Sequence, residues 1–160
     1  MVITRRYRDS DAPVIAALTI AAIRQTALKA YSPEQVAAWS ARYAVERLVQ
    51  GAAKGDWIQV AVDTDDAPVA YAVMEPDGHL DMLYCHPDHT GTGLARRLLA
   101  ESEEAARALE LSRIFTEASE LAKPVFERAG YSLLHRRDFT IPFEGREVAI
   151  HNYAMEKRLA

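Results

Sequence analysis

The residues with the clearest chemical pattern lie between His86 and Leu99, a stretch that reads HPDHTGTGLARRLL. Gly91 and Gly93 have no Cβ atom, so a ligand can approach the backbone closely there. The first amides of a helix have no partner inside it, and the helix dipole places a partial positive charge at the same end. A glycine turn that opens a helix therefore predicts a site for a phosphate or pyrophosphate, although a strand-to-helix turn without a ligand would show the same two glycines.

Other residues in this stretch argue against three common types of site: a dinucleotide site, an NTPase phosphate loop and a metal site. A dinucleotide fingerprint would need a third glycine where Arg96 stands, and an NTPase phosphate loop would need Gly-Lys-Ser/Thr, which is absent. His86 and His89 lack the spacing of a helical metal-binding pair and have no obvious third ligand. We therefore predict that they are loop residues near the phosphates, and we predict no metal site.

A second pair of titratable residues precedes this turn. His79 and Asp81 stand two residues apart in a segment of high strand propensity, and side chains two apart on a regular strand point to the same face. An imidazole changes its charge near neutral pH, so the pair suits proton transfer. His79 also follows the turn at Asp77 and Gly78, where an exposed hairpin residue without a function would fit equally well.

Length, composition and charge limit the class of protein. The chain has 160 residues, of which 49% are hydrophobic and 26% charged, and this predicts one globular domain over residues 1–160. The formal net charge of −4 argues against nucleic acid as the main partner, because binding to a phosphate backbone needs a concentrated basic face. Cys85 is the only cysteine, which excludes a disulfide framework and favours a reducing cytoplasm. The longest apolar stretch, residues 12–23, is shorter than a membrane span, so we expect no membrane partner and a cytoplasmic protein.

The elements that position these residues follow from hydrophobic periodicity and from turn and cap residues. Residues 9–11 offer N-cap side chains to a first helix, Ser32 and Gln35 come close to a capping box, and Gly130 closes a late helix. The last two strands are joined across residues 142–145. Strands are predicted at about residues 2–7, 57–62, 68–74, 79–85, 112–117, 131–141 and 147–157. Helices are predicted at about residues 13–30, in two short pieces between 33 and 52, at 94–109 and at 121–129.

The order of strand, glycine turn and helix resembles the acetyl-coenzyme A (acetyl-CoA) signature of the GNAT superfamily of N-acetyltransferases. That signature is a hydrophobic strand, a proline, two residues and then Gln/Arg-x-x-Gly-x-Gly/Ala. Thr90 stands where the family usually has Gln or Arg, but the backbone carries most of the phosphate contact, so this loss weakens the match without removing the site. The matching positions are Leu83, Cys85, Pro87, Thr90, Gly93 and Ala95.

A second segment strengthens the resemblance. Residues 119–131 look like the family's second motif, Asn-x-x-Ala-x-x-Phe-Tyr-x-x-x-Gly-Phe, with Phe126 at the position of its usual tyrosine. Residues 31–35, 38–39 and 152–157 are similar to a bacterial GNAT subgroup whose members mostly have no assigned substrate. The order of the predicted elements is also that of the GNAT fold. The resemblance therefore implies an α/β (α+β) fold with a central mixed, mostly antiparallel sheet of about seven strands flanked by helices.

The resemblance also implies a reaction and the residues that perform it. Acetyl-CoA would be the acetyl donor, without a metal, and the primary amine of a small molecule would attack it directly in a ternary complex. Relatives hold the base on the strand before the glycine turn, which implies Asp81 or His79 here. A backbone N–H at or beside Leu83 would polarise the thioester carbonyl. The residues implied to bind the cofactor are Leu83, Tyr84, Cys85, Thr90, Gly91, Thr92, Gly93, Leu94, Ala95, Arg96 and Phe126.

The proton donor and the acceptor pocket leave several candidates. The phenylalanine in the second motif cannot donate a proton, so the acid would be Tyr31, Tyr84, Tyr153 or water. Tyr31, Trp39 and Tyr43 could line the acceptor pocket with aromatic surface. Alternatively, Trp39 and Tyr43 could be core residues at helical spacing.

Two other functions stay open from the sequence alone. Thr90 and Phe126 would also fit an acetyl-CoA-binding protein that has lost catalysis and that binds the cofactor without releasing thiol. An N-acetyltransferase for proteins or peptides would be favoured if the pocket were an open groove rather than one closed by residues 31–43. The sequence also leaves a homodimer open.

Overall fold

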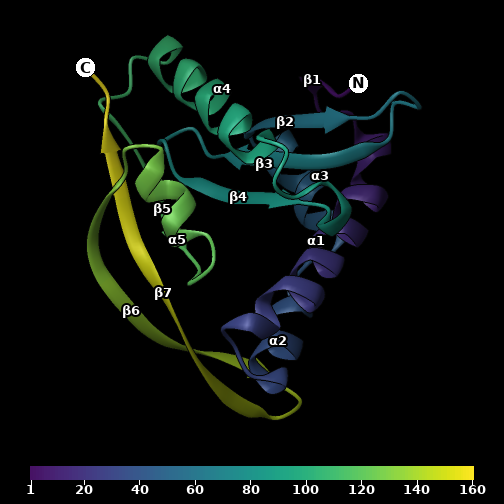
Figure 1. Ribbon diagram of the computed structural model, residues 1–160, viewed down its shortest axis with the longest axis vertical. Coiled ribbons are helices and arrows are strands. Elements are labelled where there is room, and N and C mark those ends of the chain that lie inside the picture. Colours follow the sequence, from purple (N-terminus) through teal and green to yellow (C-terminus); the bar gives the residue numbers. More distant parts are fainter.

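Seven strands in two sheets form the centre of the protein, and the computed structural model describes all of residues 1–160 (Figure 1). Every ladder within the sheets is antiparallel. The number and positions of the strands confirm the prediction, although the sequence suggested one sheet rather than two. The first sheet contains, in spatial order, β1 (Ile3–Arg6), β2 (Trp57–Val62), β3 (Pro68–Met74) and β4 (Leu80–Cys85). The second contains β5 (Arg113–Ala118), β7 (Arg146–Arg158) and β6 (Ser132–Phe143).

The two sheets meet where β4 and β5 begin, and there the contact is parallel. His79 and Phe115 form a parallel bridge, and the Phe115 amide donates to the Gly78 carbonyl at 3.1 Å. Thr116 Oγ1 adds a hydrogen bond of 2.8 Å to the Leu80 carbonyl. Beyond these residues no backbone hydrogen bond joins the two strands, so the sheets diverge and one edge of β4 stays open (Figure 1).

Helices cover both faces of the first sheet. α1 (Ala12–Thr26) and α3 (Val45–Ala53) lie on one face, where Tyr71 and Met82 belong to the core. α4 (Leu94–Ala108) packs on the opposite face of β2, β3 and β4. β3 is buried along its whole length, as expected for a strand that has helices on both sides.

The helical run that contains α1 is longer than the apolar stretch counted in the sequence. A 3-10 turn at Asp9–Asp11, α1 and a 3-10 turn at Ala27–Lys29 follow one another without a break. These 21 residues are long and apolar enough to cross a membrane by length and composition alone. Half of the most apolar part is buried inside the molecule, where Ile15 and Leu18 belong to the core. A core helix has the same property, and the absence of a membrane partner stays a prediction.

Asp11 takes part in capping the helical run that contains α1, as predicted for residues 9–11, but at the start of the 3-10 turn. Its side chain makes no cap bond to α1 itself. Its carboxylate instead accepts hydrogen bonds of 2.9 Å from two nitrogens of the Arg5 guanidinium and one of 2.8 Å from the Arg8 amide. Asp11 therefore closes the start of the helical run through the Arg8 amide and ties it to β1 through the bidentate pair with Arg5.

α2 (Pro33–Ser40) docks on the long β6–β7 hairpin, which lies far from it in the sequence (Figure 1). The predicted capping box is confirmed, because the Gln35 amide donates to Ser32 Oγ at 3.2 Å and the Ser32 amide donates to Gln35 Oε1 at 2.9 Å. Gln35 Nε2 also donates to the Ala149 carbonyl of β7 at 2.9 Å. The cap residue that starts α2 therefore also ties it to the second sheet.

The turn between β6 and β7 is tighter than predicted. Glu144 and Gly145 alone form it, with φ of 50° and 77°. Two residues of positive φ match the twist of a two-residue hairpin. Pro142 and Phe143, predicted as loop, extend β6, where a proline is tolerated because β6 is an edge strand.

α5 (Lys123–Arg128) is shorter than the helix predicted over residues 121–129. Its end confirms the role of Gly130, which has φ of 96°. The Gly130 amide donates to the Glu127 carbonyl at 3.1 Å and the Tyr131 amide donates to the Phe126 carbonyl at 3.0 Å, the two bonds of a Schellman cap.

Candidate active site

The glycine turn before α4 leaves a row of backbone amides unpaired. None of the amides from Thr90 to Arg96 donates a hydrogen bond within the chain, and the first bond of α4 runs from the Arg97 amide to the Gly93 carbonyl at 3.0 Å. Gly91 and Gly93 have φ of 75° and 83°, and a Cβ atom at either position would meet no atom within 4 Å. The turn therefore presents hydrogen-bond donors to open space, which is the arrangement that an anion requires.

Two arginines add positive charge at this turn. A cavity of about 390 Å³ lies against it and is lined by Arg96 of α4 and Arg128 at the end of α5. Neither guanidinium is hydrogen-bonded or paired with a carboxylate within the chain, whereas the neighbouring Arg97 donates to the Val2 carbonyl at 3.1 Å. Arg128 is not among the residues predicted from the sequence, because its position depends on how α5 packs beside α4.

Most of the residues predicted to bind the cofactor line this cavity. Thr92 does not, because its hydroxyl donates to the His89 carbonyl at 2.6 Å. The Thr90 hydroxyl donates in the same way to the Pro87 carbonyl at 3.1 Å, so both threonines hold the shape of the turn. The predicted residues that line the cavity are Cys85, Thr90, Gly91, Gly93, Leu94, Ala95 and Arg96.

The open edge of β4 presents the backbone N–H of Leu83, which is predicted to polarise the thioester carbonyl. The His86 amide donates to the Val69 carbonyl at 2.8 Å, and bonded and unbonded pairs alternate along an antiparallel ladder. Tyr84 is therefore bonded to β3, whereas the N–H and C=O groups of Leu83 and Cys85 face the open edge. An extended ligand could bind there as an additional strand would.

The space at the glycine turn continues along this open edge. The cavity there shares Cys85 and Ala95 with a neighbouring cavity of about 200 Å³, which reaches Trp39 and Tyr84. Trp39 and Tyr84 also border a space of about 70 Å³ beside Leu83 and a further cavity of about 350 Å³. A path therefore runs from the glycine turn past Leu83 to this last cavity, which we call the acceptor cavity.

Asp81 lies at a bulge in β4. Met74 pairs with Leu80 while the preceding residue of β3 pairs with Met82, so Asp81 has no partner of its own. Leu80 consequently packs in the core under α4, whereas Met82 packs in the core under α1. The bulge breaks the regular alternation between Leu80 and Met82. The side chains of His79 and Asp81 still lie together as predicted, with ligand atoms within 4.8 Å of each other. At this bulge the Asp81 side chain lies in the wall of the acceptor cavity.

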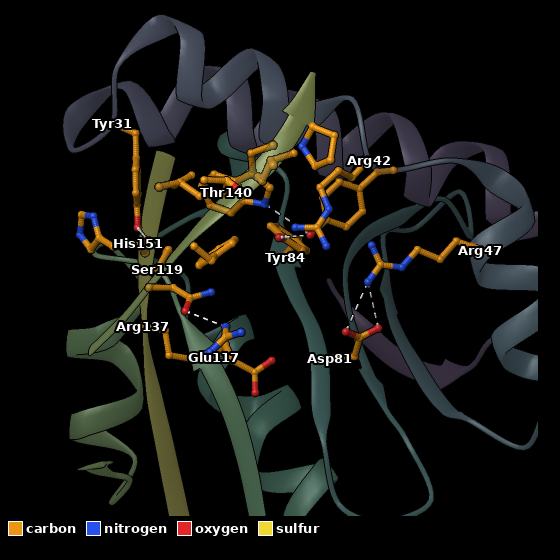
Figure 2. Close-up of a pocket in the computed structure, with 17 residues that line it drawn as sticks. Tyr31, Arg42, Arg47, Asp81, Tyr84, Glu117, Ser119, Arg137, Thr140 and His151 are labelled. Atoms are coloured by element: carbon orange, nitrogen blue, oxygen red, sulfur yellow. Dashed lines mark hydrogen bonds and ion pairs between the residues drawn. The ribbon is translucent and has the colours of Figure 1, made fainter. Parts of the chain in front are cut away.

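Glu117 stands across the opening from Asp81. The parallel bridge between His79 and Phe115 places Glu117 level with Asp81, two residues further along each strand. Both carboxylates line the acceptor cavity, and Arg47 of α3 pairs with Asp81 at 3.3 Å (Figure 2). Glu117 is not predicted from the sequence, because only the contact between β4 and β5 brings it to the site.

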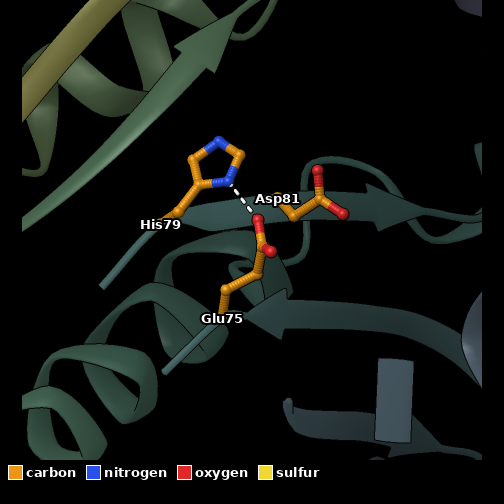
Figure 3. Close-up of side chains that lie close together, drawn as sticks. All are labelled: Glu75, His79 and Asp81. Carbon is orange, nitrogen blue, oxygen red and sulfur yellow. Dashed lines mark hydrogen bonds and ion pairs between the residues drawn. The ribbon is translucent and has the colours of Figure 1, made fainter. Parts of the chain in front are cut away.

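His79 lies between two carboxylates. Its Nε2 is 2.8 Å from Glu117 Oε1, and its Nδ1 bonds to Glu75 (Figure 3). The bond with Glu117 raises the pKa of His79 to about 9, with Glu75 adding to the rise and burial opposing it. The same bond with His79 lowers the pKa of Glu117. With this pKa the imidazole holds its proton at neutral pH, which disfavours its use as a base, and that use stays a prediction.

Glu75, His79 and Asp81 each place one ligand atom within 4.8 Å of the others (Figure 3). Such a group has the composition of a cation site. However, both ring nitrogens of His79 already bond to carboxylates, and an imidazolium flanked by acids accounts for the arrangement.

The tyrosines predicted as proton donors occupy different places. The Tyr31 hydroxyl donates to the His151 carbonyl at 3.0 Å and accepts from the Glu120 amide at 2.9 Å, so it is engaged in holding the backbone. The Tyr153 hydroxyl bonds to the Glu120 carboxylate and lines none of the cavities described above. Both hydroxyls are therefore engaged within the chain, and Tyr31 and Tyr153 as proton donors stay predictions. Only Tyr84 lies where the cavities join.

Tyr84 belongs to a chain of hydrogen bonds in the acceptor cavity. Its hydroxyl lies 2.7 Å from that of Tyr43, which accepts from Trp39 Nε1 at 3.4 Å. Burial and then Tyr43 raise the pKa of Tyr84 well above its ordinary value, so its hydroxyl stays protonated. Tyr31, Trp39 and Tyr43, the three residues predicted for substrate contact, all line the acceptor cavity.

Phe126 is mainly a core residue. Its side chain is 3% exposed and packs edge-on against Tyr131, with 5.0 Å between ring centroids. It reaches the cofactor path only at the small space beside Leu83. Its predicted cofactor contact is therefore limited to that border.

The acceptor cavity has both charged and aromatic walls (Figure 2). It lies between α2, the start of α3, the β6–β7 hairpin and the ends of β4 and β5. Three arginines line it: Arg42 after α2, Arg47 of α3 and Arg137 of β6. None of them is predicted from the sequence, because they come from three separate elements that only the fold brings together.

Known proteins resemble this chain in sequence and in fold. The family model described as an acetyltransferase (GNAT) domain matches residues 27–156. The uncharacterized N-acetyltransferase YafP of Escherichia coli (strain K12) is 30% identical over 134 residues, which cover 83% of each chain. A crystal structure of a GCN5-related N-acetyltransferase from Rhodopseudomonas palustris has 32% sequence identity and a TM-score of 0.85, covering 98% of this chain and 95% of its own.

A more distant structure shares the fold. The PaiA N-acetyltransferase from Thermoplasma acidophilum, solved in complex with coenzyme A, is 15% identical, with a TM-score of 0.80 over 99% of both chains. At this identity the likeness shows the fold alone.

Proposed function

Because the chain belongs to the GNAT family of acetyltransferases, and is thus an acyltransferase, we propose that it transfers the acetyl group of acetyl-CoA to the primary amine of a small molecule. The observation that carries the proposal is the path from the unpaired amides at the glycine turn to the carboxylates of Asp81 and Glu117. One end of this path suits phosphates and the other suits an amine.

The residues along the path fit coenzyme A. Amides from Thr90 to Arg96 would bind the pyrophosphate, and Arg96 and Arg128 would add positive charge. The free N–H and C=O of Leu83 would hold the extended part of the molecule and polarise the thioester carbonyl. Acetyl-CoA would supply an activated thioester, and the PaiA protein of the same fold supports this choice of cosubstrate.

Asp81 is the proposed base. An amine attacks only when it is neutral, so a group of the enzyme must take its proton. The Asp81 carboxylate borders both the acceptor cavity and the space beside Leu83, and Arg47 holds it from the side at 3.3 Å. His79 carries a proton already, and its proposed role is to position Glu117, which would attract the ammonium form of the substrate.

Tyr84 is the proposed donor of a proton to the leaving thiolate. Trp39 Nε1 donates to the Tyr43 hydroxyl, and Tyr43 can in turn donate to Tyr84. The hydroxyl proton of Tyr84 is then free to point into the path. Tyr84 would thus supply the acid that Phe126, at the family's usual tyrosine position, cannot supply.

The enclosure of the acceptor cavity favours a small amine over a protein. Side chains of α2 and of the β6–β7 hairpin, such as Trp39 and Ile141, line the same cavity. The bond from Gln35 to the Ala149 carbonyl fastens the two elements together. A protein terminus would need an open groove at this place. The cytoplasmic location and the homodimer stay predictions.

Thiol release from acetyl-CoA, measured over a panel of small primary amines and short peptides, tests the proposed function. We expect release with small amines, and a kcat lower by about 10²- to 10⁴-fold in Asp81→Asn with unchanged acetyl-CoA binding. Asp65→Asn, in the turn between β2 and β3, is the matched control and should keep full activity. Binding of acetyl-CoA without release from any amine would favour a protein that has lost catalysis, and release with peptides alone would favour a protein acetyltransferase.

A further inference from the structure

We propose that the acceptor is an amine that also carries an anionic group, and that Arg137, with Arg42 opposite it, binds that group. This inference rests on the proposed function and names the class of its substrate. It follows from which charges in the acceptor cavity already have partners and which do not.

Arg137 has no anionic partner. Its Nη1 donates to Asn152 Oδ1 at 2.9 Å, and its guanidinium carbon lies 5.1 Å from the centre of the Phe139 ring. Its charge helps to lower the pKa of Glu117 after the bond with His79, but no carboxylate lies within ion-pair distance of it, although it lines the acceptor cavity. The adjacent Arg136 differs, because it pairs with Asp138 at 3.0 Å and stays outside the cavity.

Arg42 is also free. It lies between α2 and α3, on the opposite side of the cavity from β6, and its side chain makes no hydrogen bond or ion pair within the chain. Arg47 is not available in the same way, because it pairs with Asp81 and lies over the Tyr43 ring at 5.1 Å.

The carboxylates of the cavity do not balance these two arginines. Asp81 is paired with Arg47, and Glu117 is paired with His79. A ligand that was only a cation would add positive charge beside the half-buried, unpaired guanidinium of Arg137 and the exposed one of Arg42, which is unfavourable. An anionic group on the same molecule removes this cost, and the planar fork of Arg137 matches a carboxylate or a phosphate.

The positions of the charges suggest how such a molecule would lie. Its amine would lie near Asp81, at the end of the cofactor path, and its anionic group against Arg137 on the hairpin side (Figure 2). The aromatic rings of Trp39 and Tyr84 would border the part between the two ends. Amino acids and other amines that bear a carboxylate, or amines that bear a phosphate ester, have this chemistry.

Calorimetric binding and thiol release with matched amines test the inference. The panel holds α-amino acids, their amides, their decarboxylated amines and an amine with a phosphate monoester, each titrated into the full chain with coenzyme A present. We expect the anionic members to bind at least about tenfold more tightly than the amides, and Arg137→Gln to remove this preference while leaving the amides unchanged. Arg137→Lys should keep part of the preference, because it retains the charge without the fork.

Arg136→Gln is the matched control, and it should keep the preference of the wild type. Comparing the affinities of the amines that bear a carboxylate and the amine that bears a phosphate shows which anionic group the cavity prefers. Equal binding of anionic and uncharged members, or an equal loss for both in Arg137→Gln, would overturn the inference. Preferential binding of anionic amines without thiol release would instead support the inference and contradict the proposed acetyl transfer, so the two failures are distinguishable.

Discussion

The imidazole of His79 keeps its proton because carboxylates flank both of its nitrogens. Glu117 and Glu75 stabilise the charged form more than partial burial opposes it. Of the two titratable residues before the glycine turn, Asp81 is therefore the one that we propose as the base. Two residues that look alike as bases in the sequence are thus assigned different roles.

The raised pKa of His79 makes part of the folding stability depend on pH. The histidine of an unfolded chain titrates at about 6.5, and His79 in the folded chain titrates at about 9. Because the folded state holds the proton more tightly, this contribution is fully present below about pH 6.5 and is lost as the pH rises through about 9. We expect the difference in unfolding free energy between the wild type and His79→Gln to shrink over that range, measured by urea denaturation at a series of pH values.

His135→Gln provides the comparison for this experiment. His135 is an exposed residue of β6 whose ring contacts only the neighbouring Arg136 carbonyl, at 3.1 Å. Its replacement should give a difference from the wild type that does not change between pH 6.5 and 9. The same flat profile for His79→Gln would show that the carboxylates do not hold its proton.

Two glycines share the same backbone conformation, so substituting each of them distinguishes the effect of backbone strain from an effect on ligand binding. Gly93 and Gly145 have φ of 83° and 77°, and a Cβ at either would meet no atom within 4 Å. Replacement by alanine should cost each about 1 kcal/mol of stability, since an L-residue is disfavoured at positive φ. Only Gly93→Ala should weaken acetyl-CoA binding in calorimetry, because its methyl group would project toward the phosphates. Equal affinity in the two variants would mean that the phosphate site is misplaced.

At the scale of the elements, the opening between β4 and β5 depends on one close approach. Gly78 has φ of 97°, and a Cβ there would lie 2.6 Å from the Arg113 carbonyl oxygen. The strands can therefore touch at their beginnings only because this residue is glycine. The bulge at Asp81 then interrupts β4, and the two sheets separate around the path that we assign to the cofactor.

α2 closes the acceptor cavity, and its cap offers a way to loosen it. Ser32→Ala should lower the unfolding free energy by about 0.5–2 kcal/mol, because the Gln35 amide loses its acceptor. Trp39 lies on the same helix, so the KM for the amine should rise while the Kd for acetyl-CoA stays unchanged. Denaturation and steady-state kinetics together measure both effects.

Glu34→Gln is the control for this variant. It removes the exposed pair with Arg146, of 2.8 Å, and should cost at most about 1 kcal/mol. It should leave the KM for the amine close to that of the wild type. A loss of acetyl-CoA affinity in Ser32→Ala would contradict the assignment of α2 to the acceptor side.

At the scale of the whole molecule, the cofactor path lies between α4, α5 and the open edge of β4. A ligand in it should therefore stabilise the entire fold rather than one loop. Acetyl-CoA at about 100 times its Kd should add roughly 2.7 kcal/mol to the unfolding free energy. For a domain of this size the melting temperature rises by about 2–4 °C per kcal/mol, so a shift of several degrees is expected. NAD and ATP are the controls in this thermal melt. A shift with NAD or ATP as large as that with acetyl-CoA would contradict the proposed cofactor.

The sequence by itself determined the features that neighbouring residues control. Alternation located the seven strands, the capping box at Ser32 and Gln35 formed as predicted, and Gly130 closed α5. The glycine turn at Gly91 and Gly93 was also recognisable, because a helix start and positive φ depend on a few consecutive residues. These local signals are what identified the family, and the family match supports them.

Only the tertiary structure decided which side chains meet. The division into two sheets, the bulge at Asp81 and the place of Glu117 level with it follow from the register of strands that are distant in the sequence. The proton on His79 and the unpaired charge of Arg137 depend in turn on those neighbours. Hydrophobic periodicity specifies which face of an element is buried but not which element it meets. The charges that line the proposed acceptor cavity are therefore set by the packing.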